Sequence, residues 1–295
     1  MSGSEFEIVG IRETETHSDG IQKKWYQGKP LVSLCFLALI LAGCFGSRFI
    51  MTKDPTYMDL LNYNLAPNAE FWFGTDTMGR DIFSMIWYGG RVSLLIGFLS
   101  TAISTVIAIV FGAVSGIAPQ WLDMLLMRAT EILLSIPNLL LVILLQAMLG
   151  KANVLTLSIV IGVTSWTSIA KVVRTEVRQI RNSEYVVASR CMGGSFFHIL
   201  WKHLTPNFVS SIMFMVVMNV RSAIVAESTL SFMGIGLPLE IISWGSMLSL
   251  SEKALLGGSW WIILIPGIFL VVTLLCMTNV GNYLRKSVNQ KESNL

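Results

Sequence analysis

Residue types that commonly carry catalysis are few in this chain, and their spacing does not suit catalytic chemistry. The three histidines are His17, His198 and His203. The last two lie five residues apart, so a helix would not bring them to one face as it would an i, i+4 pair. The chain has no Gly-x-x-x-x-Gly-Lys-Ser/Thr phosphate loop and no His-Glu-x-x-His zinc helix. We therefore expect no catalytic residues, no metal site and no cofactor held by this chain.

Two charged residues, Arg221 and Glu227, interrupt an otherwise apolar stretch. An arginine at the centre of a membrane span costs about 2.5–3.5 kcal/mol on insertion scales, so Arg221 should face the interior of a helix bundle or water. Glu227 lies six residues on, and an ideal helix rotates it away from Arg221. Two interpretations remain for Arg221: it lines a pathway and meets a carboxylate of a cargo or partner subunit, or it forms a structural ion pair or snorkels to a surface.

A patterned polar segment, residues 182–207, separates two apolar stretches. Good N-cap residues precede Glu184, whose carboxylate would lie in a first helical turn, where the helix dipole favours an anion. Gly193-Gly194 should interrupt this helix, because two adjacent glycines cost about 2 kcal/mol relative to alanine. A second short helix, Ser195–Leu204, would then run to Pro206. The pattern indicates two short helices at an angle, which form either an amphipathic surface loop or a contact with another protein.

The stretch from Met51 to Gly90 is also polar, and it carries Asp76, Arg80 and Asp81 close together. We expect these three residues to form a local ion-pair cluster at the start of the following apolar segment. Contact with a substrate is the alternative.

The elements that must position these residues are membrane helices. Of the 295 residues, 53% are hydrophobic and 13% are charged, whereas a soluble domain has roughly 25% charged residues. The net charge of +3 is too small to indicate binding to nucleic acid. The four cysteines have no metal-site or disulfide spacing.

Six apolar segments reach the length of about 20 residues that crosses a bilayer. They are Leu31–Ile50, Val92–Pro119, Ile132–Leu149, Leu155–Val172, Phe208–Leu230 and Trp260–Val280. The second is rich in small and hydroxylated residues, which favours a place inside the bundle. Pro137 and Pro266 should bend the third and sixth segments or mark their packing sites. Four tryptophans suit an interfacial belt: Trp72, Trp87, Trp260 and Trp261.

The distribution of Lys and Arg predicts the orientation, because cytoplasmic loops carry an excess of both. With both termini inside, the cytoplasmic face receives Arg12, Lys23, Lys24, Lys29, Arg128, Lys171, Arg174, Arg178, Arg181, Arg190, Lys202, Arg285, Lys286 and Lys291. The outer face receives Lys53, Arg80, Arg91, Lys151 and Lys253. We therefore expect a cytoplasmic N-terminus, six spans, a cytoplasmic C-terminus, and segment 182–207 in the cytoplasm.

Three blocks of residues, in order, resemble permease subunits of bacterial ABC importers of the oligopeptide/dipeptide/nickel family, of the C type. Glu184, Ala188, Gly193 and Pro206 are similar to the "EAA" loop of these subunits. The other blocks are Phe73–Ser84 with Gly90–Leu94, and Glu227–Gly236 with Ser243–Gly245. The chain departs from the pattern at Ser189 and Gly194, where alanine is common, and in the segment between Gly236 and Ser243.

The resemblance implies an all-α integral membrane protein with the six-helix transmembrane domain of type I ABC importers and cytoplasmic coupling helices. It divides the chain into a cytoplasmic tail (1–30), a first span with an extracytoplasmic segment (31–91), a permease core (92–288) and a C-terminal tail (289–295). Its site residues would be the coupling loop Glu184, Ala188, Ser189, Gly193, Gly194, His203 and Pro206, and the motif Gly74, Thr75, Asp76, Gly79, Arg80 and Asp81. Arg221 and Glu227 would be candidates for contact with the pathway or the partner permease.

The implied function is ATP-driven import of di- or oligopeptides across the bacterial plasma membrane, with nickel or a metal chelate as the alternative cargo. The implied partners are a second homologous permease, two ATPase subunits that bind ATP and Mg²⁺, an extracytoplasmic solute-binding protein and the lipid bilayer. A self-sufficient carrier or channel is a distant alternative, which would need its own ion site or filter.

Overall fold

The computed structural model describes residues 30–181, 183–184, 189, 191–193, 205–250, 254 and 257–292. The regular elements of this part of the chain are helices, apart from one isolated bridge between Thr75 and Asp81, and turns and loops connect them. Its helices are α1 (Leu31–Phe45), α2 (Ser47–Ile50), η1 (Leu60–Asn62), α3 (Ile82–Ile117), α4 (Gln120–Ser135), α5 (Asn138–Leu149), α6 (Val154–Thr164), α7 (Thr167–Ile180), α10 (Thr205–Phe232), α11 (Trp244–Ser249) and α13 (Trp261–Glu292).

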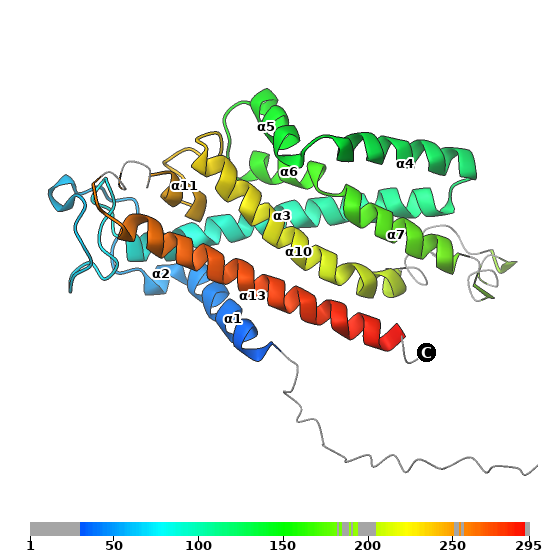
Figure 1. Ribbon diagram of the computed structural model, residues 1–295, viewed down its shortest axis with the longest axis horizontal. Coiled ribbons are helices and arrows are strands. Elements are labelled where there is room, and N and C mark those ends of the chain that lie inside the picture. The colour runs from blue at the N-terminus through cyan, green and yellow to red at the C-terminus, as the bar shows by residue number, and fades with distance from the viewer. Residues whose placement is uncertain are drawn as a thin grey trace, which may run out of the picture.

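The three longest helices, α3, α10 and α13, run lengthwise through the molecule (Figure 1). Residues 51–81 and 233–243 gather with α11 at one end, which we call the loop end. The α3–α4 turn and the C-terminus of α7 lie at the other, which we call the α7 end. At 1.5 Å per residue, α3 is about 54 Å long and exceeds the roughly 30 Å of a bilayer core.

Three to five membrane spans are supported by length and composition. In the described residues α3, α10 and α13 qualify alone, and the pairs α4–α5 and α6–α7 qualify if each bent pair counts as one span. The expected first span, residues 31–50, is divided at Gly46 into α1 and α2. Its longer part has 15 residues, fewer than the roughly 20 that cross a bilayer.

The two prolines behave differently from each other. Pro137 lies at the break between α4 and α5, where the two helices meet at 90°, as the sequence predicts. Pro266 lies inside α13, which continues through it as one helix. This proline therefore does not divide its segment into two helices. A further break of 47° separates α6 from α7 and falls at Ser165-Trp166, without proline or glycine.

The interior of the bundle is apolar and is organised around α3. One cluster joins α3 to α1, α10, α11 and α13 and includes Trp87, Trp244 and Trp261. Two others join α3 to α7 and to α5, α6 and α10. The prediction that this helix lies inside the bundle is confirmed. The aromatic-belt interpretation is wrong for Trp87 and Trp261, because both are buried; Trp72 and Trp260 are exposed.

Candidate functional site

A closed turn built on Asp76 lies at the loop end. One carboxylate oxygen accepts the backbone N–H groups of Met78 and Arg80, both at 2.8 Å. The other accepts Arg80 Nε at 2.8 Å and lies 2.7 Å from Arg80 Nη2. Both side chains are 3% exposed. The expected ion pair between Asp76 and Arg80 is therefore present, and its two members bond to each other rather than to solvent.

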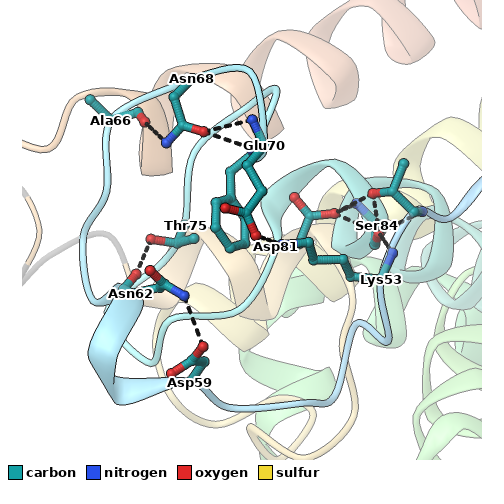
Figure 2. Close-up of polar contacts among 11 residues, drawn as sticks. Lys53, Asp59, Asn62, Ala66, Asn68, Glu70, Thr75, Asp81 and Ser84 are labelled. Carbon is teal, nitrogen blue, oxygen red and sulfur yellow. Dashed lines mark hydrogen bonds and ion pairs between the residues drawn. The ribbon is translucent and has the colours of Figure 1, made fainter.

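Asp81 does not join this ion pair but caps α3. Its carboxylate accepts the Ser84 backbone N–H at 3.0 Å and the Ser84 hydroxyl at 2.6 Å. The Thr52 hydroxyl also donates to it, at 3.1 Å. Figure 2 shows Asp81 beside Ser84, with the chain around Lys53 approaching from the other side. The expected three-residue ion cluster is thus an ion pair next to a helix cap, because the start of α3 supplies free N–H donors to Asp81.

The remaining residues of this motif fasten segment 51–81 to the bundle. Thr75 donates to the Asn62 carbonyl at 2.5 Å and accepts the Leu65 N–H at 2.8 Å, and its own carbonyl accepts Trp261 Nε1–H at 3.1 Å. Gly79 has a φ of +73°, and a Cβ there would lie 1.7 Å from the Asp59 carbonyl oxygen. Only glycine fits that position. Gly74 has a φ of +75° for a similar turn.

Glu227 is a fully buried carboxylate surrounded by serines at the loop end of α10. Four hydroxyls lie within hydrogen-bonding distance of it: Ser93 at 2.9 Å, Ser228 at 3.4 Å, Ser231 at 3.0 Å and Ser243 at 2.7 Å. Because these partners belong to its own chain and leave it no exposed surface, Glu227 does not line an open pathway in this structure. Its contact with a partner permease stays a prediction.

Three of these hydroxyls also accept a backbone N–H from the segment that follows α10. The N–H donors are those of Trp244 to Ser93, Leu237 to Ser231 and Ser246 to Ser243. Each of these serines therefore connects the segment to the carboxylate. Arg221, in contrast, is half-buried on α10, and its Nε has no hydrogen-bond partner in the described part of the chain.

The loop end also contains a hollow of about 1090 Å³. Four segments line it: the chain around Tyr63 and Met78, the α5–α6 connection with Lys151, residues 231–240, and the end of α11 at 249–250. Among the described residues no three His, Cys, Asp or Glu side chains are grouped so that they could hold a metal ion.

Elsewhere in segment 51–81, hydrogen bonds from Thr56 to the exposed Asp54 lower the pKa of that carboxyl below its usual value.

At the α7 end the predicted coupling segment is described in part. Glu184 is helical and exposed, and Ser189 is helical and buried. Gly193 has a φ of +82°, and no atom of the described residues lies within 4 Å of a Cβ built on it. Ala188, Gly194 and His203 lie outside the described residues. Pro206 is the second residue of α10, where its missing N–H costs little, so it opens a long helix.

Sequence reasoning missed the strongest polar cluster, which is centred on Asp123 of α4. Arg174 of α7 donates two hydrogen bonds to this carboxylate, Nε at 2.5 Å and Nη2 at 2.5 Å. Arg178 Nη1 adds a third at 2.7 Å and the Ser115 hydroxyl a fourth at 2.6 Å. A signal was present in the sequence: Arg174, Arg178 and Arg181 recur every three or four residues, so they share one helix face.

The chain matches a family of known proteins over residues 108–290. The description of that family is binding-protein-dependent transport system inner membrane component. The dipeptide transport system permease protein of Bacillus subtilis (strain 168) is 37% identical over 82% of this chain and 76% of its own length. The oligopeptide transport system permease protein of the same organism is 35% identical over 88% and 85%. That of Haemophilus influenzae is 34% identical over 92% and 88%.

Proposed function

Because the chain belongs to the family of binding-protein-dependent transport system inner membrane components, we propose that it forms half of the translocation pathway of an ATP-driven peptide importer. It is a helical, multi-pass membrane permease of the ABC importer type and is not itself catalytic. Membership of this family implies that an ATPase and a binding protein work with it. The further proposal is that a second, homologous permease completes the pathway and that two ATPase subunits drive it.

The observation that carries the peptide assignment is the identity of 34–37% to dipeptide and oligopeptide permeases over 82–92% of the chain. Nickel is less well supported, because the relatives named here are peptide permeases. The hollow at the loop end supports docking of a binding protein on that side, since four segments meet around it.

Reconstitution tests the cargo directly. The chain would be co-expressed with its partner permease, ATPases and binding protein, purified as a complex and placed in vesicles. We expect ATP-dependent accumulation of a labelled tripeptide, inhibited by excess unlabelled di- and oligopeptides and unaffected by Ni²⁺. Uptake of Ni²⁺ without peptide uptake would contradict the peptide assignment while leaving the permease assignment in place.

The proposed coupling element is the segment that joins α7 to α10, with the α7 end in the cytoplasm. ATP-driven closure of the ATPases would displace this segment, and the helices on either side would carry the displacement toward the pathway. Gly193 supports this mechanism, because its φ of +82° gives a sharp turn that residues with a Cβ adopt only under strain.

A matched pair of substitutions tests the coupling element. Gly193→Val should leave the amount of assembled complex unchanged and reduce peptide uptake at least tenfold while ATP hydrolysis continues, because valine at a positive φ costs about 1–3 kcal/mol and will shift the turn. Gly258 provides the control: its φ is +75° and a Cβ there would also meet no described atom within 4 Å, but it lies in the connection between α11 and α13. Equal uptake by the Gly193→Val and Gly258→Val complexes would rule out a special role for this turn.

A further inference from the structure

The Asp123 carboxylate is fully committed to neighbouring helices. It is 4% exposed, and the four hydrogen bonds from Arg174, Arg178 and Ser115 use the roughly four acceptor positions of a carboxylate. The two bonds from Arg174 form a bidentate pair, which fixes direction as well as distance. One side chain of α4 is thereby tied to both α7 and α3.

The basic partners lie just before the proposed coupling segment. Arg174 and Arg178 are in the last two turns of α7, and Arg181 follows directly and donates to the Gly116 carbonyl of α3 at 3.0 Å. The described coupling residues begin at Ser183. A displacement of that segment that is transmitted to α7 moves the arginines that hold Asp123.

Apart from Asp123, α4 meets the bundle through partly buried apolar side chains, of which Leu133 packs against the cluster between α3 and α7. The only buried residues of α4 are Asp123 and Thr130, and Trp121, Leu125 and Ile132 are each more than 60% exposed. By contrast, α3 and α7 pack so closely at Gly112 and Gly116 that a Cβ would clash with α7. The pair α3–α7 is thus closely packed, whereas α4 is joined to it by one buried carboxylate and by looser apolar contacts.

From this geometry, and on the basis of the proposed function, we propose that Asp123 is a positioning residue that makes α4 move together with α7. A displacement of the coupling segment, passed on through α7, then reaches the turn between α3 and α4 as well as the helices that flank the coupling segment. At its far end α4 meets α5 at a 90° break, so a shift of α4 changes the angle at Pro137. The Asp123 cluster thereby transmits the displacement of the coupling segment to the third apolar segment, Ile132–Leu149.

The test uses the complete importer in vesicles and measures peptide uptake and ATP hydrolysis in the same preparation. The readout is the number of peptides transported per ATP hydrolysed. Asp123→Asn and Arg174→Met should each lower this ratio at least tenfold, because each removes the bidentate pair. Arg178→Met should lower it less, since it removes one hydrogen bond of four. The control is Glu131→Gln on the same helix, whose exposed ion pair with Arg128 is remote from α7 and should leave the ratio unchanged.

A merely structural role would lower uptake and hydrolysis together, in proportion to the amount of assembled complex. An unchanged ratio in Asp123→Asn and Arg174→Met would therefore overturn the proposal, as would an equal fall of the ratio in Glu131→Gln. If the Asp123→Asn complex does not assemble, the experiment uses Arg174→Lys instead, because lysine keeps the positive charge and loses the bidentate geometry. A wild-type complex without ATP-dependent peptide uptake would instead contradict the proposed function, so the two failures are distinguishable.

Discussion

At the scale of single residues, Glu227 shows how a carboxyl group can be kept inside a helix bundle through hydroxyl groups, with no ion-pair partner among the described residues. Four serine hydroxyls surround its carboxylate, and three of them accept backbone N–H groups from the segment after α10. A buried carboxylate is costly unless its acceptor positions are satisfied, and here they are. The carboxylate in turn fixes the position of α11, whose N-cap is Ser243.

Serine-to-alanine substitutions around Glu227 should therefore differ in their effect. Ser243→Ala removes a donor at 2.7 Å and the cap of α11, and should lower the stability of the folded chain by about 1–3 kcal/mol. Ser228→Ala is the control, because its hydroxyl is the most distant from the carboxylate, at 3.4 Å. Among the described residues this hydroxyl accepts no backbone N–H from the segment after α10. Thermal unfolding of the purified complex in detergent measures the difference. Equal midpoints for the two variants would show that the network does not hold α11.

At the scale of elements, the close approach of α3 and α7 depends on missing side chains. A Cβ at Gly112 would lie 2.6 Å from the Ala170 carbonyl oxygen and 2.8 Å from the Val173 Cβ. A Cβ at Gly116 would lie 2.7 Å from a methyl carbon of Val177. Since a backbone carbonyl cannot rotate out of the way as a side chain can, α7 would have to move.

Gly112→Ala should therefore destabilise the protein by about 1–3 kcal/mol, the usual cost of overpacking. The matched control is Gly267→Ala in α13, where a Cβ would meet nothing within 4 Å. There alanine should be neutral or stabilising by up to about 1 kcal/mol, because it has the higher helix propensity. The yield of monodisperse complex after a series of heating steps compares the two. A Gly112→Ala protein as heat-resistant as Gly267→Ala would contradict the packing argument.

Local patterns predicted the elements where one residue dominates the backbone. The small residues of α3 indicated an interior helix, and Pro137 indicated a bend, because both effects act within a turn or two of the residue. Pro266 has the same chemistry, yet α13 continues through it, because membrane helices tolerate a proline where neighbouring groups and local adjustments satisfy the freed backbone carbonyl. The break between α6 and α7 falls at Ser165-Trp166, where no proline or glycine predicts it.

The same distinction applies to the candidate sites. Asp76 and Arg80 are four residues apart, so their pairing follows from local spacing. Asp123 and Arg174 are separated by 51 positions, and only the fold brings them together. Glu227 was recognised as a charged residue type in an apolar stretch, but its partners Ser93 and Ser243 lie on other elements. Both serines fall in the blocks that resemble the importer family, yet their positions in the sequence do not show that they meet Glu227.

At the scale of the whole molecule, the two ends differ in charge. The α7 end and the last turns of α13 carry basic residues: Arg174, Arg178, Arg181, Arg285 and Lys286. The loop end carries Lys53, Arg80 and Lys151, of which Arg80 is paired with Asp76 and Lys53 with Glu70; at the α7 end Asp123 pairs with two of the five basic residues. An excess of Lys and Arg favours the cytoplasmic side, so we expect the α7 end to face the cytoplasm and the loop end to face outward.

Single cysteines at the two ends test this orientation. In a chain whose four native cysteines are replaced by serine, Leu61→Cys places a thiol at the loop end and Met192→Cys places one in the coupling segment, at sites that are 95% and 82% exposed. A membrane-impermeant maleimide added to intact spheroplasts should label Leu61→Cys within minutes and should label Met192→Cys only after permeabilisation. The control is a thiol at Ile40, which is buried and should stay unlabelled in both conditions. The reverse pattern, with Met192→Cys labelled first, would place the coupling segment outside and remove it from reach of any cytoplasmic ATPase.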